Sequence, residues 1–258
     1  MRATLTVLGS GTSMGVPTIG CDCAVCRSSD PRDRRTRPSV WIEYGGRSVL
    51  IDTTPDFREQ AIREHIRSLD AVLYTHAHAD HILGIDDLRP LSFLHKPGRL
   101  PLYARPDVAA FIRNMFRYIF DANYKFGGLP HVELKPLEGP VVLFGARFEP
   151  VTVIHGETEI YGYRFGSAAY LTDHSVVPEA SFEQLRDLDI LFLDALRHKP
   201  HPTHSTVENS LRIVERVKPK RAFFTHICHD LAHAETNASL PANVQLSYDG
   251  MKLEFEIW

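Results

Sequence analysis

The side chains most suited to chemistry in this sequence lie in one short loop. The loop contains four potential metal ligands within six residues, His76, His78, Asp80 and His81. It follows an apolar run, residues 71–74, that predicts a strand ending at the loop. His76 and His78 are two residues apart, so in an extended segment they point to the same side. Asp80 and His81 can turn towards a second position, so the loop is suited to two metals rather than one.

Four residues from one loop cannot complete two coordination shells, so further ligands must come from elsewhere. Three candidates each follow an apolar run, namely His155, Asp173 and His226. The carboxyl end of a strand is where a sheet presents side chains to a cleft. Taken alone, each is more often a buried histidine or a turn-forming aspartate than a metal ligand. Together with the histidine-rich loop, they predict one shared metal site.

A second metal-binding pattern lies near the N-terminus. Cys21, Cys23 and Cys26 are too closely spaced for separate structural roles, and thiolates at this spacing bind zinc well. In a reducing compartment, cysteines at this spacing are better suited to bind a metal as thiolates than to form disulfides. His229 and Cys228 are the two candidates for the fourth ligand. Because four protein ligands leave no open position for a substrate, this zinc would be structural.

The order of these residues resembles that of the metallo-β-lactamase-fold hydrolase superfamily, and the resemblance spans nearly the whole chain. It implies an α/β (α+β) fold, a four-layer αββα sandwich with a two-metal site at the rim of its paired sheets. A water or hydroxide shared by the two ions would be the nucleophile. The implied ligand sets are His76, His78 and His155 for one metal, Asp80, His81 and His226 for the other, and Asp173 as the bridge.

One branch of the superfamily, the phosphoribosyl 1,2-cyclic phosphate phosphodiesterases, is the most similar. Its Cys-X-Cys-X-X-Cys and His-Ile-X-X-His pairing resembles this chain, which implies His229 rather than Cys228 as the fourth zinc ligand. His204-Ser205-Thr206 resembles a signature shared by that branch and ribonuclease Z, with Asp194 upstream. The resemblance implies that His204 contacts the scissile phosphate, stabilising its charge or protonating the leaving oxygen.

The remaining residues of the implied site have supporting roles. Asp194 would orient His204, and Asp52, which ends a predicted strand, would orient the histidine loop. We expect His204, Asp194 and the ligand Asp80 to be the catalytic residues. His198 and His201 lie near His204 but outside the pattern, and we expect neither to be a ligand.

The predicted function is a dinuclear metal-dependent phosphodiesterase for a small cyclic phosphodiester, such as phosphoribosyl 1,2-cyclic phosphate. Zn²⁺, Mn²⁺ or Fe²⁺ would suit the two catalytic positions. A ribonuclease Z-like RNA endonuclease is one alternative, although those enzymes typically insert a long arm where residues 156–172 fit only a hairpin. A hydrolase of another ester class and a metal-binding protein without hydrolytic activity are the others.

Composition bounds the partners and the domain organisation. With 258 residues, 43% hydrophobic and 24% charged, the chain can form one hydrolase domain over residues 1–258. A net charge of −3 argues mildly against an obligate nucleic-acid binder without excluding one. Four arginines, at positions 32, 34, 35 and 37, predict a solvated loop rather than an RNA-binding patch. The short apolar runs predict no signal peptide and no membrane span, hence a cytoplasmic protein, and the resemblance suggests a homodimer.

Several elements are predicted from hydrophobic patterns. Strands are expected at residues 4–8, 40–44 and 47–51, the last two joined by a Gly-Gly turn. A helix-like segment is expected from residue 84. The aromatic-rich stretch 111–126 predicts a helix packed on the core or at a subunit interface.

Overall fold

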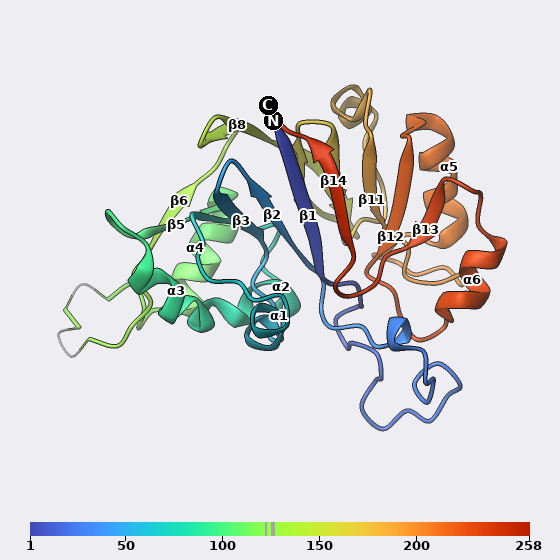
Figure 1. Cartoon of the computed structure of the whole chain (residues 1–258), viewed down its shortest axis with the longest axis horizontal. Coiled ribbons are helices and arrows are strands. Elements are labelled where there is room, and N and C mark those ends of the chain that lie inside the picture. The colour runs from blue at the N-terminus through green and yellow to red at the C-terminus, as the bar shows by residue number, and fades with distance from the viewer. Residues whose placement is uncertain (122, 125–126) are drawn as a thin grey trace.

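Two mixed β-sheets of seven strands each pack face to face, with helices on both outer faces (Figure 1). The structure is a computed structural model, and it describes residues 1–121, 123–124 and 127–258. In spatial order, the first sheet contains β14 (Lys252–Glu256), β1 (Arg2–Gly9), β2 (Ser39–Tyr44), β3 (Arg47–Ile51), β4 (Ala71–Leu73), β5 (Leu100–Ala104) and β6 (Val132–Pro136). The second contains β13 (Val244–Leu246), β12 (Arg221–Thr225), β11 (Ile190–Asp194), β10 (Ala168–Leu171), β9 (Thr158–Phe165), β8 (Ala146–His155) and β7 (Val141–Leu143).

Helices complete the four layers. Those beside the first sheet are α1 (Phe57–Arg63), α2 (Ala79–Ile82), η2 (Leu83–Leu88), α3 (Arg89–Leu94) and α4 (Pro106–Met115). Those beside the second sheet are η3 (Glu179–Leu185), α5 (Val207–Val217) and α6 (His233–Ser239), and a short 3₁₀ helix, η1 (Pro31–Asp33), follows the cysteine-rich loop. The αββα sandwich predicted from the sequence is confirmed.

Alternation of side chains along the strands divides the apolar residues among three cores. In β11, Ile190 and Phe192 face the central core between the sheets, whereas Leu191 and Leu193 face the outer core beneath α5. This is the two-residue period of a strand whose two faces are both covered. Both sheets contribute to the central core, so each sheet depends on the other for burial.

Most of the predicted elements are confirmed, and one is corrected. The strands expected at residues 4–8, 40–44 and 47–51 correspond to β1, β2 and β3, and the expected helix-like segment at residue 84 lies in η2. The helix predicted over 111–126 is wrong in extent, because α4 ends at Met115 and Phe116 leaves helical torsions at φ −106° and ψ 43°. Phe126 lies outside the described residues. Within the described part of the chain, no helix has the length and apolar character needed to cross a membrane.

The strand order brings the predicted site residues to one edge of the sandwich. Strands β3 and β4 are parallel in the first sheet, and β10, β11 and β12 are parallel in the second. Parallel neighbours end at the same edge, so the loops that follow them gather there. The two sheets are joined at this edge, because Tyr163 Oη donates to the carbonyl of Tyr74 at 2.8 Å and Tyr161 N to that of Thr75 at 3.1 Å.

Candidate metal centre

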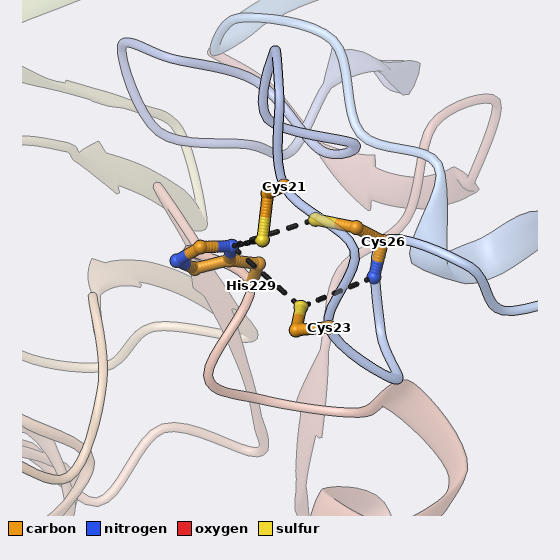
Figure 2. Close-up of side chains that lie close together, drawn as sticks. All are labelled: Cys21, Cys23, Cys26 and His229. Carbon is orange, nitrogen blue, oxygen red and sulfur yellow. Dashed lines mark hydrogen bonds between the residues drawn. The ribbon is translucent and has the colours of Figure 1, made fainter.

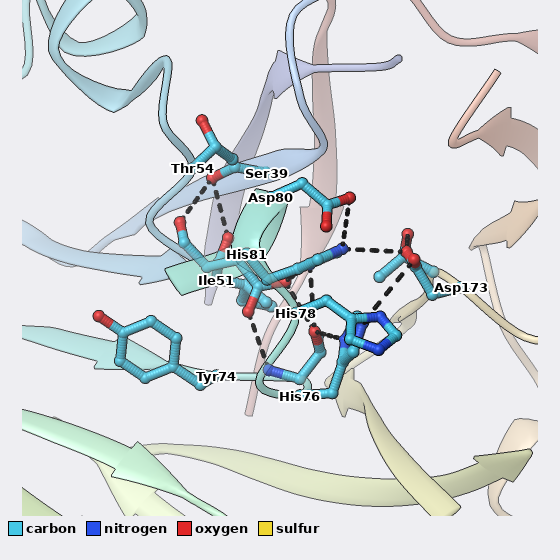
Figure 3. Close-up of polar contacts among 12 residues, drawn as sticks. Ser39, Ile51, Thr54, Tyr74, His76, His78, Asp80, His81 and Asp173 are labelled. Carbon is cyan, nitrogen blue, oxygen red and sulfur yellow. Dashed lines mark hydrogen bonds and ion pairs between the residues drawn. The ribbon is translucent and has the colours of Figure 1, made fainter. Parts of the chain in front are cut away.

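The predicted histidine loop runs from the end of β4 into α2, and its side chains turn towards one another (Figure 3). His76 Nε2 lies 3.0 Å from His78 Nδ1. His155, the last residue of β8, comes from the other sheet, with its ring 5.5 Å from that of His76 and 5.0 Å from that of His78. The three ligand atoms are close enough to hold one ion, and His78 is exposed, so this side of the group faces solvent.

A second group, fully buried, consists of Asp80, His81, Asp173 and His226. Asp173 Oδ1 lies 3.3 Å from His81 Nε2, and Asp173 Oδ2 lies 3.1 Å from His226 Nε2. Asp80 Oδ2 lies 3.3 Å from His81 Nε2 and 3.6 Å from His226 Nε2. Asp173 also lies 3.9 Å from His76 Nε2, so its carboxylate is shared between the two groups.

The atoms of the second group converge without bonding to one another. Asp80 Oδ2, His81 Nε2 and His226 Nε2 are buried and have no hydrogen-bond partner in the part of the chain that the structure describes. Buried polar atoms of this kind are rare in native proteins, and coordination of an ion satisfies them. A tetrahedral ion with bonds of about 2.0–2.1 Å separates its ligand atoms by about 3.3 Å, close to the spacing found here. The donor set therefore fits a bound divalent metal.

The charges of this pocket also favour a cation. Burial alone would raise the pKa of Asp173, but His226 and His81 hold the pKa of this carboxyl well below its ordinary value. Burial alone would lower the pKa of His226, but Asp173, Asp80 and Asp194 raise it to about 9. Two buried carboxylates, those of Asp80 and Asp173, thus face two imidazoles, and buried charge is stable only when it is paired or coordinates a metal.

Asp52, which is predicted to orient the histidine loop, is hydrogen-bonded to two residues of that loop. Its buried carboxylate accepts hydrogen bonds from Thr75 N and Thr75 Oγ1, both at 2.8 Å. It also accepts from His81 Nδ1 at 2.8 Å. Nε2 is therefore the nitrogen that His81 presents to the buried group, an arrangement typical of metal-ligating histidines.

Asp52→Asn is expected to weaken metal binding by about 10- to 100-fold, because the amide cannot accept from both Thr75 and His81 with the strength of a carboxylate. Competition with a coloured chelator measures the affinity. Asp107→Asn, at an exposed position of α4, is the matched control and should leave the affinity unchanged. An Asp52→Asn protein with wild-type metal affinity would show that Asp52 does not orient the ligand.

Three of the site residues have left-handed backbone torsions, with φ of 67° at Asp52, 55° at Asp173 and 58° at His226. Glycine adopts these torsions easily, whereas other residues do so at a cost of about 1–2 kcal/mol. Each of the three follows the end of a strand. Asp173 and His226 belong to the buried group, and Asp52 accepts from His81 of that group. Strain of this kind persists where the surroundings fix it, and it is concentrated at functional sites.

His204 and Asp194 form a pair beside the second group. His204 Nδ1 lies 2.7 Å from Asp194 Oδ2, and the His204 ring stacks on that of His226 at 4.5 Å. Burial lowers the pKa of His204 to about 4 and raises that of Asp194 well above its ordinary value, so both shifts favour the uncharged forms. Because Asp194 occupies Nδ1, Nε2 is the nitrogen of His204 that is left for a substrate.

The cysteine-rich loop forms a separate cluster with His229 (Figure 2). His229 Nδ1 lies 3.3 Å from the Cys21 sulfur, 3.7 Å from that of Cys23 and 3.4 Å from that of Cys26. A tetrahedral zinc, with bonds of about 2.3 Å to sulfur and 2.0–2.1 Å to nitrogen, would hold these atoms about 3.6 Å apart. The structure brings His229 to the three sulfurs, whereas the Cys228 sulfur accepts from Asp230 N at 3.3 Å outside the cluster.

The thiols in this cluster do not all favour the thiolate on their own. The backbone N–H of Cys26 donates to the Cys23 sulfur and lowers the pKa of that thiol. Burial raises the pKa of Cys26 to about 11. A cation that binds all three sulfurs would hold all three as thiolates despite their different pKa values, because metal binding displaces the thiol protons.

Arg35 links the two sites and was not identified from the sequence. It lies in the arginine-rich loop that is predicted to be solvated. This prediction is wrong, because the Arg35 side chain is fully buried. Its guanidinium donates to the carbonyls of Cys228 at 2.8 Å and Leu231 at 2.7 Å, and to Asp33 Oδ1 at 2.9 Å. Arg35 thus holds the turn that contains His229 and directly follows His226.

Comparisons with known proteins agree with this architecture. A family model of the beta-lactamase superfamily domain matches residues 47–227. A crystal structure described as a new diphosphatase from the PhnP family has a TM-score of 0.95 and 64% sequence identity, covering 100% of this chain and 98% of that one. The octanoyltransferase of Porphyromonas gingivalis is 39% identical over 252 residues, 95% of this chain and 50% of that protein. Ribonuclease Z of Bradyrhizobium diazoefficiens is 30% identical over 147 residues, 55% of this chain and 48% of that protein.

The family match covers most of the chain, so the protein belongs to the beta-lactamase superfamily, with the fold and side-chain set of a metal-dependent hydrolase domain. Within the superfamily it belongs to the PhnP family, to judge from the relative that matches it over nearly its whole length. The resemblance predicted from the sequence is confirmed. The chain spans about half the length of the curated relatives it matches.

Proposed function

We propose that this chain is a metal-dependent phosphodiesterase that acts on a small phosphodiester. The observation that carries the proposal is the His204–Asp194 pair, which lies beside two groups of metal-binding side chains with its free nitrogen available to a substrate. Divalent ions bound there would lower the pKa of a water ligand towards neutrality and polarise the phosphate oxygens. Around them, Asp194 would orient His204, and His204 would donate to the phosphate or to the leaving oxygen.

The proposed ligand assignment follows the two groups in the structure. Asp80 is part of the second set and is counted with His204 and Asp194 among the catalytic residues. Zn²⁺, Mn²⁺ and Fe²⁺ all suit the donor atoms. The proposed sets are His76, His78 and His155 for one ion and Asp80, His81 and His226 for the other, with Asp173 shared.

The proposed substrate is small. A cyclic phosphodiester such as phosphoribosyl 1,2-cyclic phosphate is the first candidate. A diphosphate is the second, because the relative at 64% identity is described as a diphosphatase. Residues 156–172 form only the short β8–β9 turn and the β9–β10 hairpin, which leaves no arm for RNA there and weighs against a ribonuclease Z-like activity. The alternative is that the protein hydrolyses another class of ester, which the same metal-loaded protein can be used to test.

We also propose that residues 1–258 form one hydrolase domain. Supporting this, β14 near the C-terminus pairs with β1, and the central core draws on both sheets. Activity on bis(p-nitrophenyl) phosphate and on a ribose cyclic phosphate, measured with metal-loaded protein, tests the function. A fully metallated protein that cleaves neither these nor a diphosphate would overturn it.

Elemental analysis of protein purified without chelator is expected to find about three metals per chain, two at the catalytic groups and one zinc at the cysteine cluster. Cys21→Ser should remove the one zinc and His76→Ala should reduce the catalytic metal. Cys228→Ser is the matched control, because that buried sulfur lies outside the cluster. Two metals or fewer, unaffected by Cys21→Ser, would show that the cysteine cluster is not a zinc site.

A further inference from the structure

A second histidine, His201, lies beside His204 in the loop between β11 and α5. The centroids of the two rings are 5.0 Å apart. The His204 ring is in turn 4.8 Å from that of His155 and 4.5 Å from that of His226. His201 is therefore a direct neighbour of the residue that we place against the scissile phosphate.

The chain around His201 is rigid. Pro200 and Pro202 flank it, which fixes φ on both sides and restricts His201 itself to extended torsions. Arg197 braces this segment from the base of the loop. Its guanidinium donates to the carbonyl of Lys199 at 3.1 Å and to that of Pro200 at 3.3 Å.

The other end of the same loop is fixed to the metal centre. The carbonyl of Thr203 accepts from His155 Nδ1 at 2.8 Å. Gly156 permits this close approach, because a Cβ there would lie 2.9 Å from the Thr203 methyl carbon. The His201 ring is thus positioned before any substrate arrives, which reduces the entropic cost of a contact with it.

His201 has one free donor. Its Nδ1 accepts from Thr203 N at 3.3 Å, so the neutral ring carries its proton on Nε2. Burial and the neighbouring His204 lower the pKa of His201, which keeps the ring neutral. For the portion of the chain described, Nε2 has no hydrogen-bond partner, whereas His198 in the same loop is paired with Glu208 at 2.6 Å.

We propose that His201 is a specificity-determining residue that donates from Nε2 to a second phosphate, adjacent to the one that His204 contacts. This inference rests on the proposed function and favours a diphosphate-containing substrate over a diester with a single phosphate. The fixed pair of imidazoles, one beside the other, offers separate donors to two neighbouring phosphate groups.

Binding of ADP and AMP to metal-loaded protein tests this without turnover, because the two ligands differ by one phosphate. Wild-type protein should bind ADP more tightly than AMP. His201→Ala should weaken ADP binding by about 10- to 100-fold, as expected for a hydrogen bond to a charged group, and leave AMP binding unchanged. His201→Gln, whose amide can donate from a similar position, should recover most of the loss. His198→Ala is the matched control and should bind both ligands as the wild type does.

Kinetics separate this inference from the proposed function. His201→Ala should lower kcat/KM for diadenosine diphosphate by a similar factor and leave kcat/KM for bis(p-nitrophenyl) phosphate within about twofold of wild type. Equal losses on both substrates, or equal affinity of the wild type for ADP and AMP, would overturn the role of His201. Wild-type protein that cleaves neither substrate would instead overturn the proposed function, while the ADP and AMP affinities still decide on His201.

Discussion

His204→Ala is expected to reduce kcat for a phosphodiester by about 10²- to 10⁴-fold, the contribution typical of a positioned proton donor. The side chain lies 2.7 Å from Asp194, which is itself buried, and its ring lies 4.8 Å from that of His155 and 4.5 Å from that of His226. Alanine removes the donor and leaves the backbone of the loop unchanged. Steady-state kinetics on bis(p-nitrophenyl) phosphate measure the effect.

Controls decide whether this loss is chemical or structural. Metal content of the His204→Ala protein should match wild type, because His204 is outside both proposed ligand sets. His198→Ala, an exposed histidine six residues earlier in the same loop, should retain wild-type kcat. Asp194→Asn should also lower kcat, because an amide does not hold His204 in the tautomer that leaves Nε2 as the donor. Wild-type kcat in a fully metallated His204→Ala protein would contradict the proposed role.

The sequence predicted the candidate ligands because they share one local signal. His76, Asp173 and His226 each follow a short apolar run, which predicts a buried strand that ends close to the candidate ligand. Which strands pair cannot be predicted from local sequence. The family resemblance, however, implies a fold in which these strands end at one edge and bring the ligands together. The cluster of His229 with the cysteines was likewise implied by a spaced motif.

The parts that could not be predicted depend on contacts between distant segments. Arg35 lies in a polar, arginine-rich stretch. Its side chain is buried where it donates to two backbone carbonyls, which lie 193 and 196 residues further along the chain. The left-handed torsions of Asp52, Asp173 and His226 were not predicted, because none of the three is a glycine and the enrichment of aspartate and histidine in this region is too weak to single out a position. Their torsions are imposed by the strands and hydrogen bonds around them, so only the folded chain shows them.

Arg35→Met is expected to lower the free energy of unfolding by about 3–5 kcal/mol. Methionine fills a similar length of the buried channel but leaves the Asp33 carboxylate without its cation. It also leaves the carbonyls of Cys228 and Leu231 without their donor. Asp33 further accepts from His233 N at 2.8 Å, so the loss extends to the start of α6. Urea denaturation of metal-free protein measures this change apart from metal binding.

Arg34→Met is the matched control, because the neighbouring Arg34 is exposed and its replacement should change stability by less than about 0.5 kcal/mol. The Arg35 variant should also hold less metal at both sites, since the turn it anchors contains His229 and directly follows His226. Loss of zinc alone would mean that Arg35 supports only the cysteine cluster. Loss at both sites, at a denaturant concentration well below the unfolding midpoint, would show that one buried guanidinium positions ligands of two separate centres.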